Sequence, residues 1–301
     1  MSRLLGILFI LCCFGIKAAR AQSEELDLRV FEFEDGLTHR NVFKILQDHY
    51  GYIWVATSNG LNRFDGRRFV QYLNSDPINQ LPDNYIPDMV IPSDSMIWLT
   101  NKNQLTILDP RNNQVRKRAI RTKNTRRFGS TLPDNLYVDS KDRIWTIDFV
   151  PETGQSFLLR TDADKKELKD VLVCQGTFPG RSIIEYNESF FISDLNNGLR
   201  QISEDGRTTK EYLFRSPFSG NRSSWVTKMT IGPKGALWAL LNDGQVFSLA
   251  PGADEFQIHP ITNFIYNTSS FSAIQLEPNG NIRVGGIGAL WRYEYQTGRS
   301  V

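Results

Sequence analysis

One stretch of the sequence decides the fold. Residues 42–66 read VFKILQDHYGYIWVATSNGLNRFDG, in which short apolar runs alternate with turn residues. The turns are His49-Tyr50-Gly51, Asn59-Gly60 and Asp65-Gly66. Asn and Gly tolerate the positive φ that tight hairpins require. With Phe69 and Tyr72 beyond the last turn, the stretch predicts four antiparallel strands at 42–46, 53–55, 61–64 and 69–72.

The same pattern recurs with a period of about 46 residues, and an aromatic residue, or Arg in the last copy, marks the second strand of each copy. These anchors are Trp54, Trp98, Trp145, Phe191, Trp238 and Arg283, which are 44, 47, 46, 47 and 45 residues apart. Four of the six tryptophans occupy this position, so we interpret them as core residues that fill the space between stacked sheets, not as ligand-stacking residues. Four strands repeated at this period are typical of a β-propeller.

We therefore predict an all-β protein, a β-propeller of about six four-stranded blades that occupies residues 22–301. The sixth copy shows no convincing outermost strand after residues 290–295. Two explanations are open. The stretch 28–33 could supply that strand and close the ring, which would remove exposed sheet edges. Alternatively, the chain is the amino-terminal piece of a longer protein, and further blades complete a propeller of about seven blades. We favour the second explanation.

Residues 1–21 are predicted to be a secretory signal peptide. Arg3 precedes an apolar run from Leu4 to Ile16, and Ala19-Arg20-Ala21 places small residues at the positions that a signal peptidase reads. The run is shorter than the roughly 20 residues that a membrane span needs. Cleavage after Ala21 leaves 32 basic and 33 acidic residues, and Cys174 as the one remaining cysteine. We therefore expect an exported chain without an intramolecular disulfide.

The first copy of the repeat resembles the two-component regulator propeller family. The resemblance lies in the stretches DGLTHRNV (35–42), ILQD (45–48), GYIWVAT (51–57) and NGLNRFDG (59–66). It implies the periplasmic sensor region of a hybrid two-component histidine kinase: two propellers, an immunoglobulin-like domain, an inner-membrane helix and a cytoplasmic kinase. In that family such sensors commonly detect glycan fragments. The resemblance thus implies a small glycan or oligosaccharide ligand and a homodimer formed through a longer parent chain.

This chain by itself is not predicted to be an enzyme. It has no glycine-rich ATP-binding motif, and its three histidines, His39, His49 and His259, lie in turns or strands. The innermost strands are mainly apolar, and Asp88, Glu185 and Lys228 are exceptions on three different repeats. We therefore expect no catalytic residue, no metal site and no cofactor. Two alternatives remain open: a free-standing secreted propeller enzyme, such as a lyase or glycan hydrolase, and a protein-binding scaffold.

Candidate ligand-binding residues lie on one face. In a propeller, the connections between blades and the loops between second and third strands share a face, where a rigid scaffold positions polar groups. Amides, guanidinium groups and flat aromatic rings suit carbohydrate recognition. The candidates on this face are His39, Arg40, Asn84, Tyr85, Asn135, Arg181, Trp225 and Tyr266. The same residue types also build turns, so a structural role is the competing interpretation.

A basic segment forms a second candidate site. Residues 111–127 contain eight basic residues and no acidic one. Such a patch attracts polyanions, and for an exported protein we expect an acidic polysaccharide or membrane headgroups rather than nucleic acid. The candidates are Arg116, Lys117, Arg118, Arg121, Lys123, Arg126 and Arg127. The competing interpretation is a solvated outer strand and long loop of the second blade.

Overall fold

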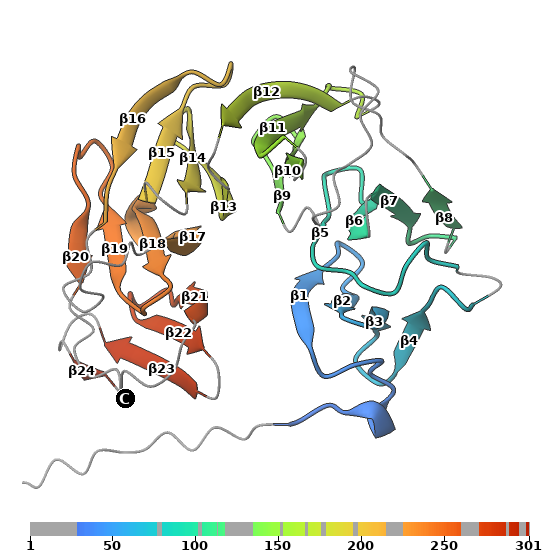
Figure 1. The fold of residues 1–301 in the computed structure, drawn as a ribbon. Helices are drawn as coiled ribbons and strands as arrows, with labels where there is room; N and C mark the ends of the chain where they lie inside the picture. Colours follow the sequence, from blue (N-terminus) through green and yellow to red (C-terminus); the bar gives the residue numbers. More distant parts are fainter. Residues whose placement is uncertain are drawn as a thin grey trace, which may run out of the picture. The chain divides into compact units, whose positions relative to one another are not determined.

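The computed structural model describes residues 29–76, 80–101, 104–112, 114–117, 135–150, 153–165, 168–175, 179–194, 198–214, 225–259, 271–286, 289–294 and 299–300. The chain divides into a short unit, Met1–Phe31, and a large unit, Glu32–Val301, which contains all the strands (Figure 1). Residues 1–21, the predicted signal peptide, lie outside the described residues.

The large unit consists of six four-stranded antiparallel sheets, the blades, whose strands pair in chain order. Blade 1 contains β1 (Val42–Gln47), β2 (Ile53–Thr57), β3 (Gly60–Phe64) and β4 (Phe69–Tyr72). Blade 2 contains β5 (Met89–Val90), β6 (Ile97–Asn101), β7 (Gln104–Asp109) and β8 (Gln114–Lys117). Blade 3 contains β9 (Leu136–Val138), β10 (Ile144–Val150), β11 (Gln155–Thr161) and β12 (Leu168–Gln175).

Blade 4 contains β13 (Pro179–Tyr186), β14 (Ser189–Asp194), β15 (Gly198–Ile202) and β16 (Thr208–Tyr212). Blade 5 contains β17 (Val226–Ile231), β18 (Leu237–Leu241), β19 (Val246–Leu249) and β20 (Gln257–His259). Blade 6 contains β21 (Phe271–Leu276), β22 (Ile282–Gly286), β23 (Ala289–Glu294) and β24 (Arg299–Ser300). The described helical residues form two 3-10 turns, η1 (Phe33–Asp35) and η2 (Pro233–Gly235). The predicted all-β propeller with six four-stranded blades is confirmed.

One expectation about the ends of the propeller is wrong, and so is the alternative in which the stretch 28–33 supplies a strand. The sixth blade does have an outermost strand, because β24 pairs with β23 through Tyr293↔Ser300. The described part of the stretch 28–33 is not a strand, and it leads into η1. Local hydrogen bonding explains this: the Asp35 carboxylate accepts the Glu32 N–H at 3.0 Å, and Gly36, with φ of 98°, ends the turn.

The hydrophobic core lies between blades. Five buried clusters are present among the described residues, and each combines side chains of two consecutive blades. Each cluster contains the anchor of the earlier blade: Trp54, Trp98, Trp145, Phe191 and Trp238, all at most 7% exposed. The interpretation of the anchors as core residues is therefore confirmed. A blade buries its apolar surface only against its neighbour, as in other repeat folds.

The turn between the first two strands has a repeated geometry. The residue three positions before each anchor has a positive φ, between 59° and 90°. These residues are Gly51, Ser95, Asp142, Glu188, Gly235 and Gly280. In five of the six turns the N–H of this residue donates to the carbonyl three residues earlier, which closes a tight turn before the anchor strand.

An acidic residue six positions before the anchor holds three of the anchors by hydrogen bonds. The acceptor–donor pairs are Asp48 with Trp54 Nε1 (2.7 Å), Asp139 with Trp145 Nε1 (2.8 Å) and Glu277 with Arg283 Nε (2.5 Å). The arginine of the divergent sixth copy thus keeps the N–H donor that the aromatic ring of Trp supplies elsewhere. In the sixth copy the anchor therefore keeps this hydrogen bond although it has lost the aromatic ring.

Candidate functional site

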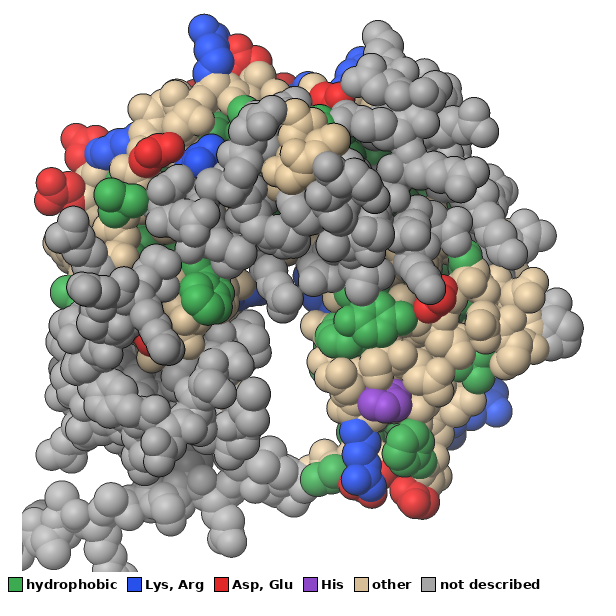
Figure 2. Space-filling model, in the orientation of Figure 1, with side chains coloured by type: hydrophobic (Ala, Val, Ile, Leu, Met, Phe, Trp, Pro, Cys, Tyr) green, Lys and Arg blue, Asp and Glu red, His purple; other side chains and the backbone are tan. Residues whose placement is uncertain are grey.

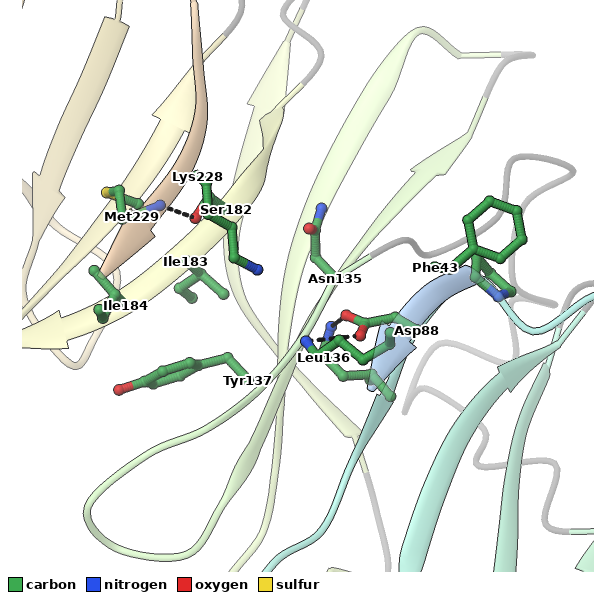
Figure 3. A pocket seen from close by; sticks show the side chains of 12 residues that line it. Phe43, Asp88, Asn135, Leu136, Tyr137, Ser182, Ile183, Ile184, Lys228 and Met229 are labelled. Atoms are coloured by element: carbon green, nitrogen blue, oxygen red, sulfur yellow. Dashed lines mark hydrogen bonds and ion pairs between the residues drawn. The ribbon is translucent and has the colours of Figure 1, made fainter. Parts of the chain in front are cut away.

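A pocket of about 190 Å³ lies among the innermost strands, and five of the six blades line it (Figure 3). We call it the central pocket. Its lining residues are Phe43, Lys44, Pro87, Asp88, Asn135, Leu136, Tyr137, Ser182, Ile183, Ile184, Lys228 and Met229. The space-filling view shows basic side chains at the hollow between the blades (Figure 2).

Four polar side chains of the central pocket occupy one position of the repeat. Each lies ten residues before the anchor of its own blade; they are Lys44, Asp88, Asn135 and Lys228. The fourth and sixth repeats have Arg181 and Ala273 at this position. Residues far apart in the chain therefore meet because they repeat the same place in successive blades.

A β-bulge precedes this position in three of the innermost strands, β1, β17 and β21, where it lies before Lys44, Lys228 and Ala273. In β1 the register shifts between Val42 and Lys44, and in β17 it shifts between Val226 and Lys228. The residue after each bulge pairs with the second residue beyond the anchor, as in Lys228↔Leu240. Bulges change the direction of a side chain relative to the sheet, and here they precede the two lysines of the pocket.

Asp88 is the acidic residue of the pocket lining, and its carboxylate is already occupied. One oxygen accepts the Met89 N–H at 2.8 Å and forms an ion pair with Lys44 at 3.0 Å. The other oxygen accepts the Leu136 N–H at 2.8 Å, which connects blade 2 to blade 3. The side chain of Asp88 is 8% exposed, so this charge is held by three donors in a buried place.

Lys228 contributes a positive charge to the pocket, and no carboxylate of the described residues forms an ion pair with it. Burial lowers the pKa of its ammonium group, the nearby Lys44 lowers the pKa further, and Asp88 offsets only part of the effect. Among the described residues, Lys228 has no ion-pair or hydrogen-bond partner. Figure 3 shows its side chain extending from β17 into the space between Ser182 and Asn135. The described lining of the central pocket therefore carries two cations and one anion that is already engaged.

Polar and aromatic groups complete the lining. Ser182 Oγ accepts the Met229 N–H at 3.1 Å and so connects blade 4 to blade 5. The ring of Phe43 contacts the ring of Tyr85, with 5.1 Å between the centroids. Phe43 is 36% exposed, which leaves an aromatic surface available beside the lysines. The site thus offers an ammonium group, a hydroxyl, an amide and a flat apolar surface.

Three of the sequence-predicted ligand residues have structural partners on the connection face. His39 Nδ1 accepts the Asn41 N–H at 2.9 Å and contacts Ser58 Oγ at 2.7 Å. Arg40 forms an exposed ion pair with Glu32 at 2.9 Å. Asn84 ties two loops together, since its amide accepts the Asn74 N–H at 2.7 Å and donates to Asn59 Oδ1 at 3.0 Å. These contacts support the structural interpretation of the three residues.

The other predicted residues divide into two groups. Asn135 lines the central pocket, and Tyr85 contacts its Phe43. Trp225, which is 38% exposed, precedes β17 and donates its backbone N–H to Asn242 Oδ1 at 3.1 Å. Tyr266 and the side chain of Arg181 lie outside the described residues. The structure therefore places Asn135 and Tyr85 at or beside one site. Trp225 lies at the surface, and its role in ligand binding stays a prediction.

Two lysines of the site were missed as ligand-binding candidates. In the sequence, Lys228 is only a charged residue on an apolar strand, and Lys44 has no feature that marks a site. Aligning the repeats on their anchors would have found both, because Lys44 and Lys228 share the position ten residues before the anchor. The third charged exception, Glu185, accepts the N–H and hydroxyl of Ser140 at 2.6 and 2.7 Å instead of lining the pocket.

The basic segment can be followed only at its start. Arg111 pairs with Asp109, with 2.8 Å between Nη2 and Oδ2. Arg116 and Lys117 belong to β8. The remaining candidates, Arg118, Arg121, Lys123, Arg126 and Arg127, lie outside the described residues. The polyanion patch stays a prediction.

Two negative findings apply to the described ranges. There, no three or more His, Cys, Asp or Glu side chains gather in a group that could hold a metal ion. The helical residues of those ranges also include no segment with the length and apolarity of a membrane-crossing helix.

Comparison with known proteins connects the first repeat to two-component signalling. The model of the family described as "Two component regulator propeller" matches residues 36–59. The resemblance of the first repeat to that family is thereby confirmed. A curated relative, Histidine kinase P4 of Formosa agariphila, is 39% identical over 66 residues, which are 22% of this chain and 5% of the kinase.

Solved structures share the propeller fold at low sequence identity. The extracellular domain of a protein described as a hybrid two component system from B. thetaiotaomicron is 20% identical, with a TM-score of 0.66, over 87% of this chain and 36% of that chain. The calcium-binding protein regucalcin from Agrobacterium tumefaciens is 11% identical, with a TM-score of 0.53, over 82% of each chain. The chain thus spans about a third of the first of these structures.

Proposed function

We propose that this chain is the ligand-sensing propeller of an exported two-component sensor, and that it detects a small glycan in the central pocket. The observation that carries the proposal is the pocket itself, where five blades place Lys228, Asn135 and the Phe43 ring around one space. Hydrogen-bonding groups beside a flat apolar surface are suited to the hydroxyls and the ring face of a sugar.

The comparisons support the signalling part of this proposal. The family match falls on the first repeat, and the curated relative is a histidine kinase. The 66 residues that align with that kinase are 5% of its length, so kinase activity would belong to a longer parent chain. In this proposal the propeller lies outside the cytoplasm, and the parent chain supplies the membrane anchor and the dimer contact.

Binding, not catalysis, is the role that the pocket chemistry supports. Glycoside hydrolysis needs a pair of carboxyl groups. Asp88 has both oxygens engaged by Lys44, Met89 and Leu136. A ligand that contacts groups of different blades would instead change how those blades are held together, and differential binding of this kind shifts a conformational equilibrium that a kinase could read.

A glycan panel tests the proposal directly. The melting temperature of the full chain would be measured with neutral and acidic di- to hexasaccharides, followed by titration calorimetry of each ligand that raises it. We expect at least one glycan to bind, and Asn135→Ala to weaken that binding roughly tenfold through the loss of a hydrogen bond. The control Lys169→Met changes an exposed residue of β12 and should bind normally.

Two results would overturn the glycan proposal. One is a panel in which no oligosaccharide stabilises the folded chain. The other is a glycan that binds Asn135→Ala as tightly as the unmodified chain, because the ligand would then occupy a different site.

A further inference from the structure

The central pocket has an excess of positive charge in a place where charge is poorly solvated. Among the described residues, its lining contains the two cations Lys44 and Lys228 and one acid, Asp88. Asp88 is 8% exposed and already engages Lys44 at 3.0 Å and two backbone N–H groups. The charge of Lys228 is therefore the one that the described side chains do not neutralise.

We infer that the central pocket binds an anionic group, a carboxylate or a sulfate ester, and that Lys228 makes the direct contact with it. The inference rests on the proposed function, since it names the chemical class of the ligand for the same pocket. The ligand would be an acidic sugar or an oligosaccharide with an acidic end.

The surroundings of Lys228 favour an incoming anion. Burying an ammonium group without a partner is unfavourable, and an anion held by hydrogen bonds reverses that effect. Burial and Lys44 both lower the pKa of Lys228, so these surroundings disfavour the charged form that an anionic ligand would stabilise. An anion bound here would also lie near the second cation, Lys44.

Neighbouring groups can complete the contact. Ser182 Oγ accepts the Met229 N–H at 3.1 Å, and its own O–H is left to donate. The Asn135 amide lies across the pocket from Lys228 (Figure 3). A lysine with a hydroxyl and an amide nearby supplies a point charge and neutral donors, which suits an oxyanion better than an uncharged hydroxyl.

The size of the pocket limits what enters it. Its volume of about 190 Å³ is smaller than the roughly 300–1,000 Å³ of typical small-molecule sites. A whole oligosaccharide does not fit into such a space, but one charged end of it does. The aromatic pair Phe43 and Tyr85 then lies beside the pocket where the adjoining sugar could rest.

The test observes Lys228 itself. The lysines of the full chain would be labelled by reductive ¹³C-methylation, and the Lys228 signal would be assigned from the spectrum of Lys228→Met. Sodium glucuronate, glucose 6-sulfate and glucose would be added at constant ionic strength. We expect a saturable shift of the Lys228 signal with glucuronate or the sulfate, no shift with glucose, and an unmoved Lys169 signal.

Calorimetry on unlabelled protein supplies the second readout. Lys228→Met should raise the dissociation constant of the acidic probe roughly tenfold to a hundredfold, because a hydrogen bond to a charged group is lost. Lys169→Met should leave it unchanged. Lys228→Gln replaces Lys228→Met if circular dichroism shows that the first variant is not folded.

The outcomes separate this inference from the proposed function. A Lys228 signal that no acidic probe moves, or Lys228 variants that bind glucuronate as tightly as the unmodified chain, overturns the inference even if neutral glycans bind. Acidic probes that move the Lys228 signal in a chain that binds no oligosaccharide support the anion site and overturn glycan sensing.

Discussion

At the scale of single residues, four of the six anchors follow an acidic residue by six positions, and the chemistry of the anchor decides what that acid binds. Asp48 and Asp139 accept the indole N–H of their anchors. Phe191 has no N–H to donate, and the corresponding acid, Glu185, accepts two hydrogen bonds from Ser140 of the preceding blade. The acid at this repeat position thus accepts hydrogen bonds from its own blade when the anchor is Trp, and from the preceding blade when the anchor is Phe.

The two tryptophan-bound aspartates allow a matched comparison. Both are buried, and both accept two backbone N–H groups of the following turn. Asp139 also pairs with Arg143, whose side chain is 11% exposed, with 2.7 Å between Oδ2 and Nη2. In the first blade the residue at the position of Arg143 is Tyr52, which contributes only its backbone N–H to Asp48.

We therefore expect Asp139→Ala to destabilise the protein more than Asp48→Ala. Removing Asp139 takes one of two carboxylate partners from the largely buried Arg143 guanidinium and leaves it Glu204. The loss should therefore lie toward the lower end of the about 3–5 kcal/mol that breaking a buried ion pair costs. Removing Asp48 leaves neutral donors without an acceptor, at about 1–3 kcal/mol. Urea unfolding of the two variants measures the difference, and equal losses would show that the arginine pair contributes nothing to stability.

At the scale of elements, close packing of backbones constrains the hairpins of the blades. Gly198 begins β15 with a φ of 80°. A Cβ at this position would lie 2.3 Å from the Tyr212 carbonyl oxygen on β16, which is far inside contact distance. Gly66, with a φ of 92°, has no atom within 4 Å of such a Cβ.

These two glycines distinguish backbone strain from collision. Gly66→Ala should cost about 1–2 kcal/mol through the left-handed conformation alone. Gly198→Ala should cost about 1–3 kcal/mol more, because β15 and β16 must move apart. Thermal and urea unfolding of both variants test this, and the prediction is wrong if the two alanines are equally tolerated.

The strands and turns were readable from the sequence, but the site was readable only in part. Local patterns such as Asn59-Gly60 determine hairpins, and the four strands predicted for the first repeat match β1 to β4. The two lysines of the central pocket each lie directly after a bulge, in β1 and in β17. Hydrophobic alternation does not reveal a bulge, so Lys44 was overlooked and Lys228 was treated as an isolated exception.

At the scale of the whole molecule, polar contacts add to the hydrophobic clusters that hold neighbouring blades together. We call each such contact region a boundary. Between blades 3 and 4, Glu204 pairs with Lys141 and Arg143, each at 2.5 Å, and with Arg160 at 3.2 Å. Hydrogen bonds from Lys141 and Arg143 lower the pKa of Glu204 to about 2. One carboxylate of blade 4 thus holds three cations of blade 3.

This cluster predicts a pH dependence of stability. The pKa of Glu204 is lower in the folded state than its ordinary value of 4.5, so its contribution is present above about pH 4.5 and is lost as the pH falls toward about 2. The side chain is 42% exposed, so solvent and salt keep the contribution small.

The comparison of wild type with Glu204→Gln measures this contribution. The difference in the free energy of unfolding should be largest near neutral pH and should narrow as the pH falls through the acidic range. Glu255→Gln controls for the loss of one negative charge at an exposed position. A difference that stays constant from neutral to acidic pH would assign the effect of Glu204→Gln to packing rather than to charge.

The placement of the anchors has a spectroscopic consequence. Four of the five hydrophobic clusters between blades each contain one anchor tryptophan. These tryptophans are Trp54, Trp98, Trp145 and Trp238. Indole emission responds to water, and these rings are at most 7% exposed. In variants that keep one anchor tryptophan, with phenylalanine at the other three anchors and at Trp225 and Trp291, the emission would come from one boundary between blades only. The order in which the emission of these variants shifts to longer wavelength during unfolding would give the order in which the blades separate.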